Sequence, residues 1–169
     1  HLYDVEILNQ DGQPLPSETR DGYFNNALVA KLYVDPPEII DPTLVPPKTF
    51  EINITLDDVE NLYGYEFNMS FNKEVLTCLY VIVNDVLGET NYIPETQVSN
   101  TRGFVWVNVT YYPPAVPITT YTPVALATIR FRVKSLGASP LDLHDTSLTD
   151  VFGNPIPHEV TDGFVMTVI

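Results

Sequence analysis

The chain has 169 residues, 8 of them basic and 22 acidic, which gives a formal net charge of −14. This balance argues against nucleic acid as a partner, because nucleic-acid binding needs clustered Lys and Arg. No apolar window of about 18 residues exists, so we expect no membrane-spanning segment. Because the chain begins at His1, without an initiator Met or a signal peptide, we interpret it as a processed mature protein or an excised domain.

The N-terminal segment is predicted to contain a strand followed by a linker. Tyr3, Val5 and Ile7 alternate with polar residues, which is the period of a strand with one apolar side. The stretch that follows is polar and contains prolines, a composition typical of a long loop. We therefore divide the chain into residues 1–26, an N-terminal strand and linker, and residues 27–169, the main domain.

The main domain is predicted to consist of about nine short strands separated by Pro, Gly and polar turns. These strands are expected at residues 27–34, 50–59, 63–71, 78–83, near 92, 104–111, 124–133, 140–143 and 163–169. Alternation assigns to the core Phe50, Ile52, Ile54, Leu56, Tyr65, Phe67, Met69, Phe71, Val105, Val107, Val109, Ile129, Phe131 and Val133. It assigns to the outside Asn53, Thr55, Glu66, Asn68, Ser70, Trp106, Asn108, Thr110, Thr128, Arg130 and Arg132. The pattern predicts an all-β jelly-roll sandwich with an extra N-terminal strand and no helix.

No signature of catalysis is present. The chain has no G-x-S-x-G, P-loop or H-E-x-x-H pattern, and its three histidines lack metal-ligand spacing. We therefore predict a non-enzyme with no catalytic residue and no histidine-bound metal. The only cysteine, Cys78, lies in an apolar run and is expected to be buried. Asp142, Asp145 and Asp150 are expected to cluster in one loop region, as solvated turn acids or as ligands of calcium, the one cofactor left open.

From about Leu32 to Val168 the order of residues resembles that of cohesin domains, particularly the non-cellulosomal, archaeal type. The resemblance is carried by FEINITLDDVENLYGYEFNMSFNKEVLTC, VALATIRFRVKSLGASPLDL and DVFGNPIPHEVTDGFVMTV. It implies a nine-stranded jelly-roll sandwich that binds another protein, a calcium-bearing dockerin, on one open sheet face without catalysis. By the matching strands, the resemblance implies that this protein-binding face carries Glu66, Asn68, Ser70, Trp106, Asn108, Arg130 and Arg132.

Three N-x-S/T sequons begin at Asn53, Asn68 and Asn108. Each asparagine lies on the outward side of its expected strand, where a glycan could be carried. Glycans at Asn68 and Asn108 would cover the protein-binding face. The sequence therefore predicts a glycoprotein whose partner or contact surface differs from that of a simple dockerin receptor.

Three non-catalytic, extracellular functions are consistent with these features. In the first, the protein polymerises with copies of itself into a surface fibre or layer, because Tyr3, Val5 and Ile7 of one subunit extend a sheet edge of the next. The alternative placement of this strand is within its own sandwich. In the second, the protein is a cohesin-type receptor for a dockerin. In the third, it is a carbohydrate-binding module that stacks sugars on Tyr111, Tyr112 and Tyr121.

Overall fold

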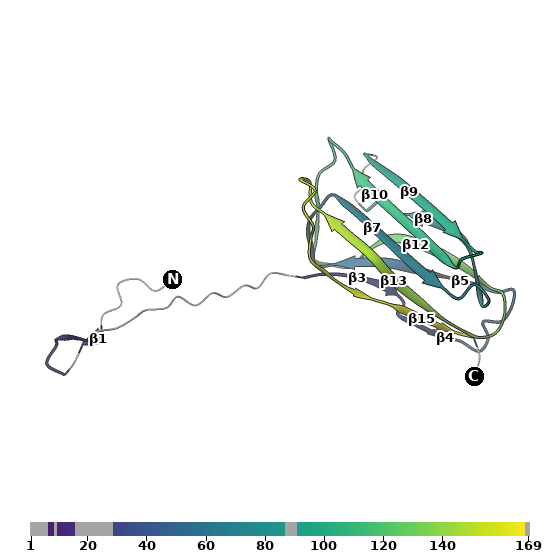
Figure 1. The fold of residues 1–169 in the computed structure, drawn as a ribbon, viewed down its shortest axis with the longest axis horizontal. Coiled ribbons are helices and arrows are strands. Elements are labelled where there is room, and N and C mark those ends of the chain that lie inside the picture. Colours follow the sequence, from purple (N-terminus) through teal and green to yellow (C-terminus); the bar gives the residue numbers. More distant parts are fainter. Residues whose placement is uncertain (1–6, 9, 16–28, 87–90, 168–169) are drawn as a thin grey trace.

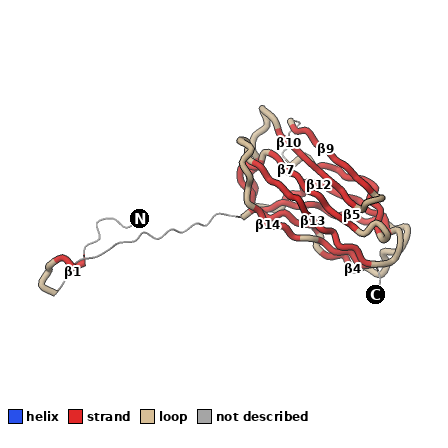
Figure 2. Tube along the Cα trace, viewed as in Figure 1, coloured by secondary structure: helices blue, strands red, loops and turns tan. Residues whose placement is uncertain are grey.

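The structure of the protein is a computed structural model that describes residues 7–8, 10–15, 29–86 and 91–167. These residues form strands and connecting loops, and none of them is helical (Figure 2). Two large sheets face each other and enclose the core between them (Figure 1). The predicted all-β jelly-roll sandwich is therefore confirmed.

The larger sheet has six strands in the order β4–β15–β13–β7–β10–β9. Their bounds are β4 (Glu38–Ile40), β7 (Gly64–Phe71), β9 (Tyr92–Ser99), β10 (Phe104–Tyr111), β13 (Ala138–Thr149) and β15 (Gly163–Met166). All neighbours in this sheet are antiparallel except β4 and β15, which run parallel. Strand β9 is therefore one edge of the sheet, and the short β4 is the other.

The smaller sheet has five strands in the order β14–β3–β5–β12–β8. Their bounds are β3 (Ala30–Asp35), β5 (Thr49–Asp57), β8 (Leu76–Val83), β12 (Val124–Val133) and β14 (His158–Thr161). A short pair, β6 (Val59–Leu62) and β11 (Ile118–Thr120), lies outside both sheets. Strands β8 and β9 are edges of different sheets and contact each other on the same side of the sandwich.

The core forms as the alternation predicts, because one side of strands such as β7 and β12 carries apolar side chains. Phe67 and Met69 of β7 are fully buried, as are Ile129 and Phe131 of β12. The ring of Phe131 meets Phe71 of the opposite sheet edge to face, with centroids 5.1 Å apart. This contact joins the two sheets directly, and aromatic pairs in this geometry stabilise cores beyond simple area burial.

Three local expectations differ from the structure. Strand β13 extends to Thr149, well beyond the predicted end at residue 143, because a bulge at Asp145 interrupts the alternation. Strand β9 covers eight residues, but its sequence shows no clear period because most of its side chains are exposed on both faces. Thr55 was expected outside, yet it is only 4% exposed, in the interior strand β5 between Tyr33 of β3 and Ala125 of β12.

Of the predicted N-terminal strand, Tyr3 and Val5 lie outside the described residues. Ile7 belongs to a two-residue strand, β1 (Ile7–Leu8), which pairs with β2 (Pro14–Leu15). Gly12 occupies the turn between them with φ +75°, a conformation that glycine adopts without strain. This small sheet shares no strand pairing with either sheet of the sandwich.

Candidate protein-binding face

We call the outward side chains of the larger sheet the six-stranded outer face. Its centre is formed by neighbouring strands, because Trp106 of β10 lies opposite Asn68 of β7, and Asn68 lies opposite His144 of β13. Glu66 and Ser70 lie above and below Asn68 on the same strand, and all five side chains are partly exposed. The structure thus brings Glu66, Asn68, Ser70 and Trp106 together on one face, as the sequence predicted.

Trp106 is held on this face by a polar contact. Its indole Nε1–H donates a hydrogen bond of 2.7 Å to Oε1 of Glu66 on the adjacent strand. A Trp with one edge bonded and one face partly exposed can bury apolar area of a partner at little entropic cost. The hydrogen bond to Glu66 therefore fixes a partly exposed Trp106 at the centre of the face.

A second polar cluster lies beside it on β7 and β13. The Oγ of Ser70 is 2.9 Å from Nε2 of His144, and Nδ1 of His144 is 2.9 Å from a carboxylate oxygen of Asp145. This is the order of atoms in a serine hydrolase triad, in which backbone N–H groups must also bind the oxyanion. However, the next two backbone N–H groups, of Phe71 and Asn72, already donate to Gly103 O and Ser139 Oγ. These two backbone N–H groups are therefore not free to bind an oxyanion beside Ser70.

Sequence reasoning missed this cluster because it ended the strand at residue 143, one residue before His144. The available signal was the alternation of Leu141, Leu143 and Leu148, in which one extra residue marks the bulge. All three leucines are buried, on both sides of the bulge.

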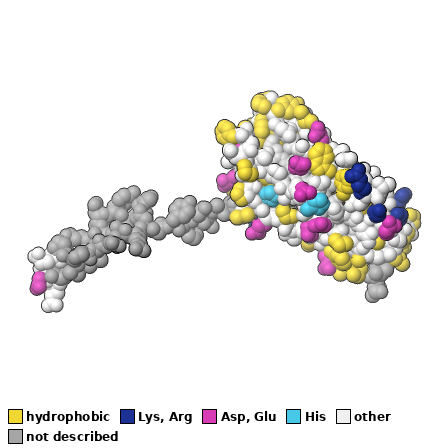
Figure 3. Space-filling model, in the orientation of Figure 1, with side chains coloured by type: hydrophobic (Ala, Val, Ile, Leu, Met, Phe, Trp, Pro, Cys, Tyr) yellow, Lys and Arg dark blue, Asp and Glu magenta, His cyan; other side chains and the backbone are white. Residues whose placement is uncertain are grey.

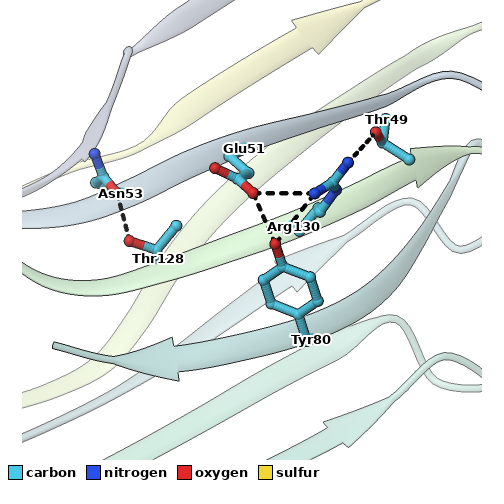
Figure 4. Close-up of polar contacts among 6 residues, drawn as sticks. All are labelled: Thr49, Glu51, Asn53, Tyr80, Thr128 and Arg130. Carbon is cyan, nitrogen blue, oxygen red and sulfur yellow. Dashed lines mark hydrogen bonds and ion pairs between the residues drawn. The ribbon is translucent and has the colours of Figure 1, made fainter.

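The prediction that Arg130 and Arg132 flank Trp106 is wrong. Both arginines belong to β12 in the five-stranded sheet, so they lie on the opposite outer surface of the sandwich. There, Arg130 bonds Thr49 Oγ1 at 2.9 Å and pairs with Glu51 at 3.5 Å, as Figure 4 shows. The Tyr80 hydroxyl donates to the same Glu51 carboxylate at 2.8 Å, so Arg130 belongs to a separate network (Figure 4).

The three sequon asparagines lie on outward, partly exposed positions. Asn68 and Asn108 belong to the six-stranded outer face, whereas Asn53 belongs to the five-stranded sheet. There the Asn53 side chain accepts a 2.8 Å hydrogen bond from Thr128 Oγ1 (Figure 4). Glycosylation at the three positions stays a prediction.

The three tyrosines proposed for sugar stacking are not all exposed at the surface. Tyr111 is only 2% exposed because its side chain points into the core, where burial raises the pKa of its hydroxyl to about 12. Tyr112 and Tyr121 are exposed, and the Tyr121 hydroxyl donates to Glu60. Stacking on Tyr111 would require opening the sandwich, so this part of the prediction is wrong.

The acidic residues predicted to share a loop are also separated. Asp142 and Asp145 lie within β13, and Asp150 follows it in a turn that its own carboxylate caps. Within residues 29–86 and 91–167 and the short N-terminal hairpin, no three His, Cys, Asp or Glu side chains are placed to hold a metal. Cys78 is buried as predicted, and burial raises the pKa of its thiol to about 11.

No helix in the part of the chain that the structure describes is long and apolar enough to cross a bilayer. No protein-family model matches the chain, and no curated protein sequence matches it either.

Solved cohesin structures share the fold of this chain. A non-cellulosomal cohesin from the hyperthermophilic archaeon Archaeoglobus fulgidus has a TM-score of 0.66 and 14% identity, covering 82% of this chain and 90% of that one. A chain of a type I cohesin–dockerin complex from Clostridium thermocellum has a TM-score of 0.67 and 14% identity, covering 83% and 99%. A type II cohesin from the cellulosome of Acetivibrio cellulolyticus has a TM-score of 0.66 and 15% identity, covering 81% and 95%.

The domain is therefore a cohesin-like β-sandwich. At these identities the likeness is one of fold, which confirms the resemblance drawn from the sequence at that level.

Proposed function

We propose that this protein is a non-catalytic, extracellular assembly domain that polymerises into a surface fibre or layer by donating its N-terminal strand to a neighbouring copy. The observation that carries the proposal is that β1 and β2 pair with no strand of their own sandwich. An alternating apolar segment whose described part, β1, pairs with neither sheet of the sandwich is suited to β-strand addition on another subunit.

The sandwich offers edges that could accept such a strand. Edge strands β8 and β9 present exposed apolar side chains, among them Ile82 at 50% and Ile93 at 57%. Unpaired backbone groups on an edge of this kind are templates for pairing with another chain. Head-to-tail donation that does not close on itself produces a filament.

The test compares two sets of substitutions in the donor strand. Replacing Tyr3, Val5 and Ile7 with Ser removes the apolar side, whereas replacing Asp4 and Glu6 with Asn and Gln changes only the polar side. We expect filaments in negative-stain electron micrographs of the natural chain and of the polar-side variant, and monomers for the apolar-side variant. Filaments formed equally by all three proteins, or by none, would refute strand donation.

A second candidate function is recognition of a dockerin-type partner on the six-stranded outer face. The observations that favour it are the cohesin-like fold and the Trp106–Glu66 pair at the centre of an open sheet face. One of the similar structures is itself a cohesin–dockerin complex. Calcium would then belong to the partner, since dockerins are expected to bear it.

Purified type I and type II dockerin domains test this candidate directly. We expect binding by calorimetry that Trp106→Ala reduces at least about tenfold, the loss typical of a central aromatic anchor. Tyr121→Ala, which removes an exposed aromatic side chain away from the face, serves as the control. Intact mass of the native protein settles the glycans, because sugars on Asn68 and Asn108 would lie on the same face and block such a partner.

A further inference from the structure

The six strands of the larger sheet contain five acidic residues and no Lys or Arg. The acids are Glu38, Glu66, Glu95, Asp142 and Asp145. By contrast, the strands of the smaller sheet contain three basic residues, Lys31, Arg130 and Arg132, against four acidic ones. The negative charge of the chain is therefore distributed unequally between the two sheets.

The acids of the larger sheet share the six-stranded outer face. Strand register places Glu95 opposite Asn108, Asp142 opposite Ser70 and Glu38 opposite Phe164, all on the outward side. Figure 3 shows acidic and histidine side chains across the middle of this face, with Lys and Arg gathered toward one end. The strands of the face thus carry acidic charges and no Lys or Arg, whereas basic side chains such as Arg102, beside the Phe104 ring, lie at one end of it (Figure 3).

Three of these acids, Glu38, Glu95 and Asp142, have no basic partner among the described residues, whereas Asp145 contacts His144 and Glu66 accepts from Trp106. On the other sheet, Lys31 lies 2.9 Å from Asp58 and Arg130 lies 3.5 Å from Glu51. Among the described residues, no Lys or Arg nitrogen comes within ion-pair distance of Glu38, Glu95 or Asp142. Like charges on an open face cost stability through mutual repulsion, and an opposite charge from outside would relieve that cost.

Apolar side chains lie among the acids. Trp106 occupies the centre, and Ile40 and Ile93 at the two edges of the sheet are 56% and 57% exposed. No other described segment packs over this face (Figure 1). An aromatic centre surrounded by charge and apolar edges has the composition of a protein interface rather than of a merely solvated surface.

We propose that the six-stranded outer face binds a protein surface rich in Lys and Arg, with Trp106 as the apolar anchor. The proposal rests on the second candidate function and names the chemistry of its partner. Charge complementarity also excludes a second copy docked face to face, because the same acids would then oppose one another. Electrostatic attraction by the acidic side chains of this face would speed association with a cationic partner, and this effect would weaken as salt is added.

The experiment selects random dodecapeptides displayed on phage against the whole protein and measures the affinity of the selected peptides by fluorescence polarisation. Three proteins are compared with the natural chain. The first is E38Q/E95Q/D142N, which removes charge from the face. The second is D35N/E74Q/E159Q, which removes the same charge from exposed positions elsewhere, and the third is Trp106→Ala.

We expect peptides enriched in Lys and Arg whose affinity falls about tenfold or more in the face variant and in Trp106→Ala. The matched control variant should stay within about twofold, because the acids that it lacks are remote from the face and screened by salt. Equal weakening by both charge variants would overturn the proposal, because it would reveal attraction to net charge alone.

Two further outcomes separate this proposal from the function on which it rests. Peptides that need Trp106 but carry no cationic enrichment, and bind the face variant as well as the natural chain, would refute a cationic partner while retaining a docking face. Failure to select any peptide that depends on Trp106 would refute both.

Discussion

Asn100 bonds Cys78 in the way that a neighbouring strand would. Its Nδ2 donates to Cys78 O at 2.9 Å, and its Oδ1 accepts from Cys78 N–H at 2.8 Å. One side chain thus satisfies the backbone of edge strand β8 at a position where a second chain could otherwise pair. Asn100 covers the β8 edge only at Cys78, so a strand added to this edge would have to pair at other positions.

Asn100→Ala should therefore have two effects. The loss of two hydrogen bonds to a part-buried backbone is expected to lower the free energy of unfolding by about 1–3 kcal/mol, measured by urea denaturation. The exposed amide and carbonyl of Cys78 should also increase self-association, measured by light scattering. Asn84→Ala, which breaks side-chain bonds at the other end of β8, serves as the comparison for the association effect. Unchanged stability would show that water replaces the Asn100 amide at no cost.

Phe131→Ala should cause the largest loss of stability among single core substitutions. The ring is fully buried and contacts Phe71 at 5.1 Å and Phe50 at 5.6 Å between centroids, so its removal leaves a cavity between the two sheets. We expect a loss of about 3–5 kcal/mol in the free energy of unfolding. Phe131→Leu should recover more than half of that loss, because it refills most of the cavity. A small effect of the alanine variant would mean that the sheets collapse around the gap.

Cys78 should make the fold sensitive to alkaline pH. Burial raises the pKa of its thiol from 9.0 to about 11 in the folded protein, so the unfolded chain releases this proton first. The contribution of the neutral Cys78 thiol to the free energy of unfolding is therefore fully present below about pH 9. It is lost as the pH rises toward 11, and the free energy of unfolding falls by about 1–3 kcal/mol. Cys78→Ala should flatten this part of the curve of unfolding free energy against pH. A thiol reagent should modify the natural chain slowly at pH 8 and rapidly in denaturant.

Gly103 should tolerate no side chain. Its φ is +77°, and a Cβ there would lie 2.4 Å from the carbonyl oxygen of Phe71, whose N–H donates to Gly103 O. Gly103→Ala must strain the turn between β9 and β10 or break that bond, and we expect a loss of about 1–3 kcal/mol. Gly12→Ala serves as the control. Gly12 also has a positive φ, but no atom lies within 4 Å of the position that its Cβ would take, and β1 and β2 pair with no strand of the sandwich.

The sequence predicted the fold well where the residues of a single strand determine which of its sides is buried. Strands such as β7 and β10 alternate strictly, because one side must be apolar to enter the core, and their buried residues are those expected. The same local pattern failed at β13, where the bulge at Asp145 shifts the period by one residue.

The candidate site was predicted only in part, because alternation separates inside from outside but does not say to which sheet a strand belongs. Sheet membership depends on pairing between residues far apart in the chain, such as Arg130 with Glu51 and Tyr80 in the backbone register. Arg130 was therefore expected beside Trp106, although the two lie on opposite outer surfaces. The Ser70–His144 contact, between residues 74 positions apart, was out of reach for the same reason.

The burial of Thr55 determines when the first sequon could be used. Its hydroxyl is one of the two groups that define the Asn53 sequon, yet the residue is only 4% exposed in the closed sandwich. A glycosylating enzyme could reach it only while the chain is still open. Sugar on Asn53 would therefore have been attached before the sandwich closed, and its occupancy would depend on how fast the chain folds relative to glycosylation.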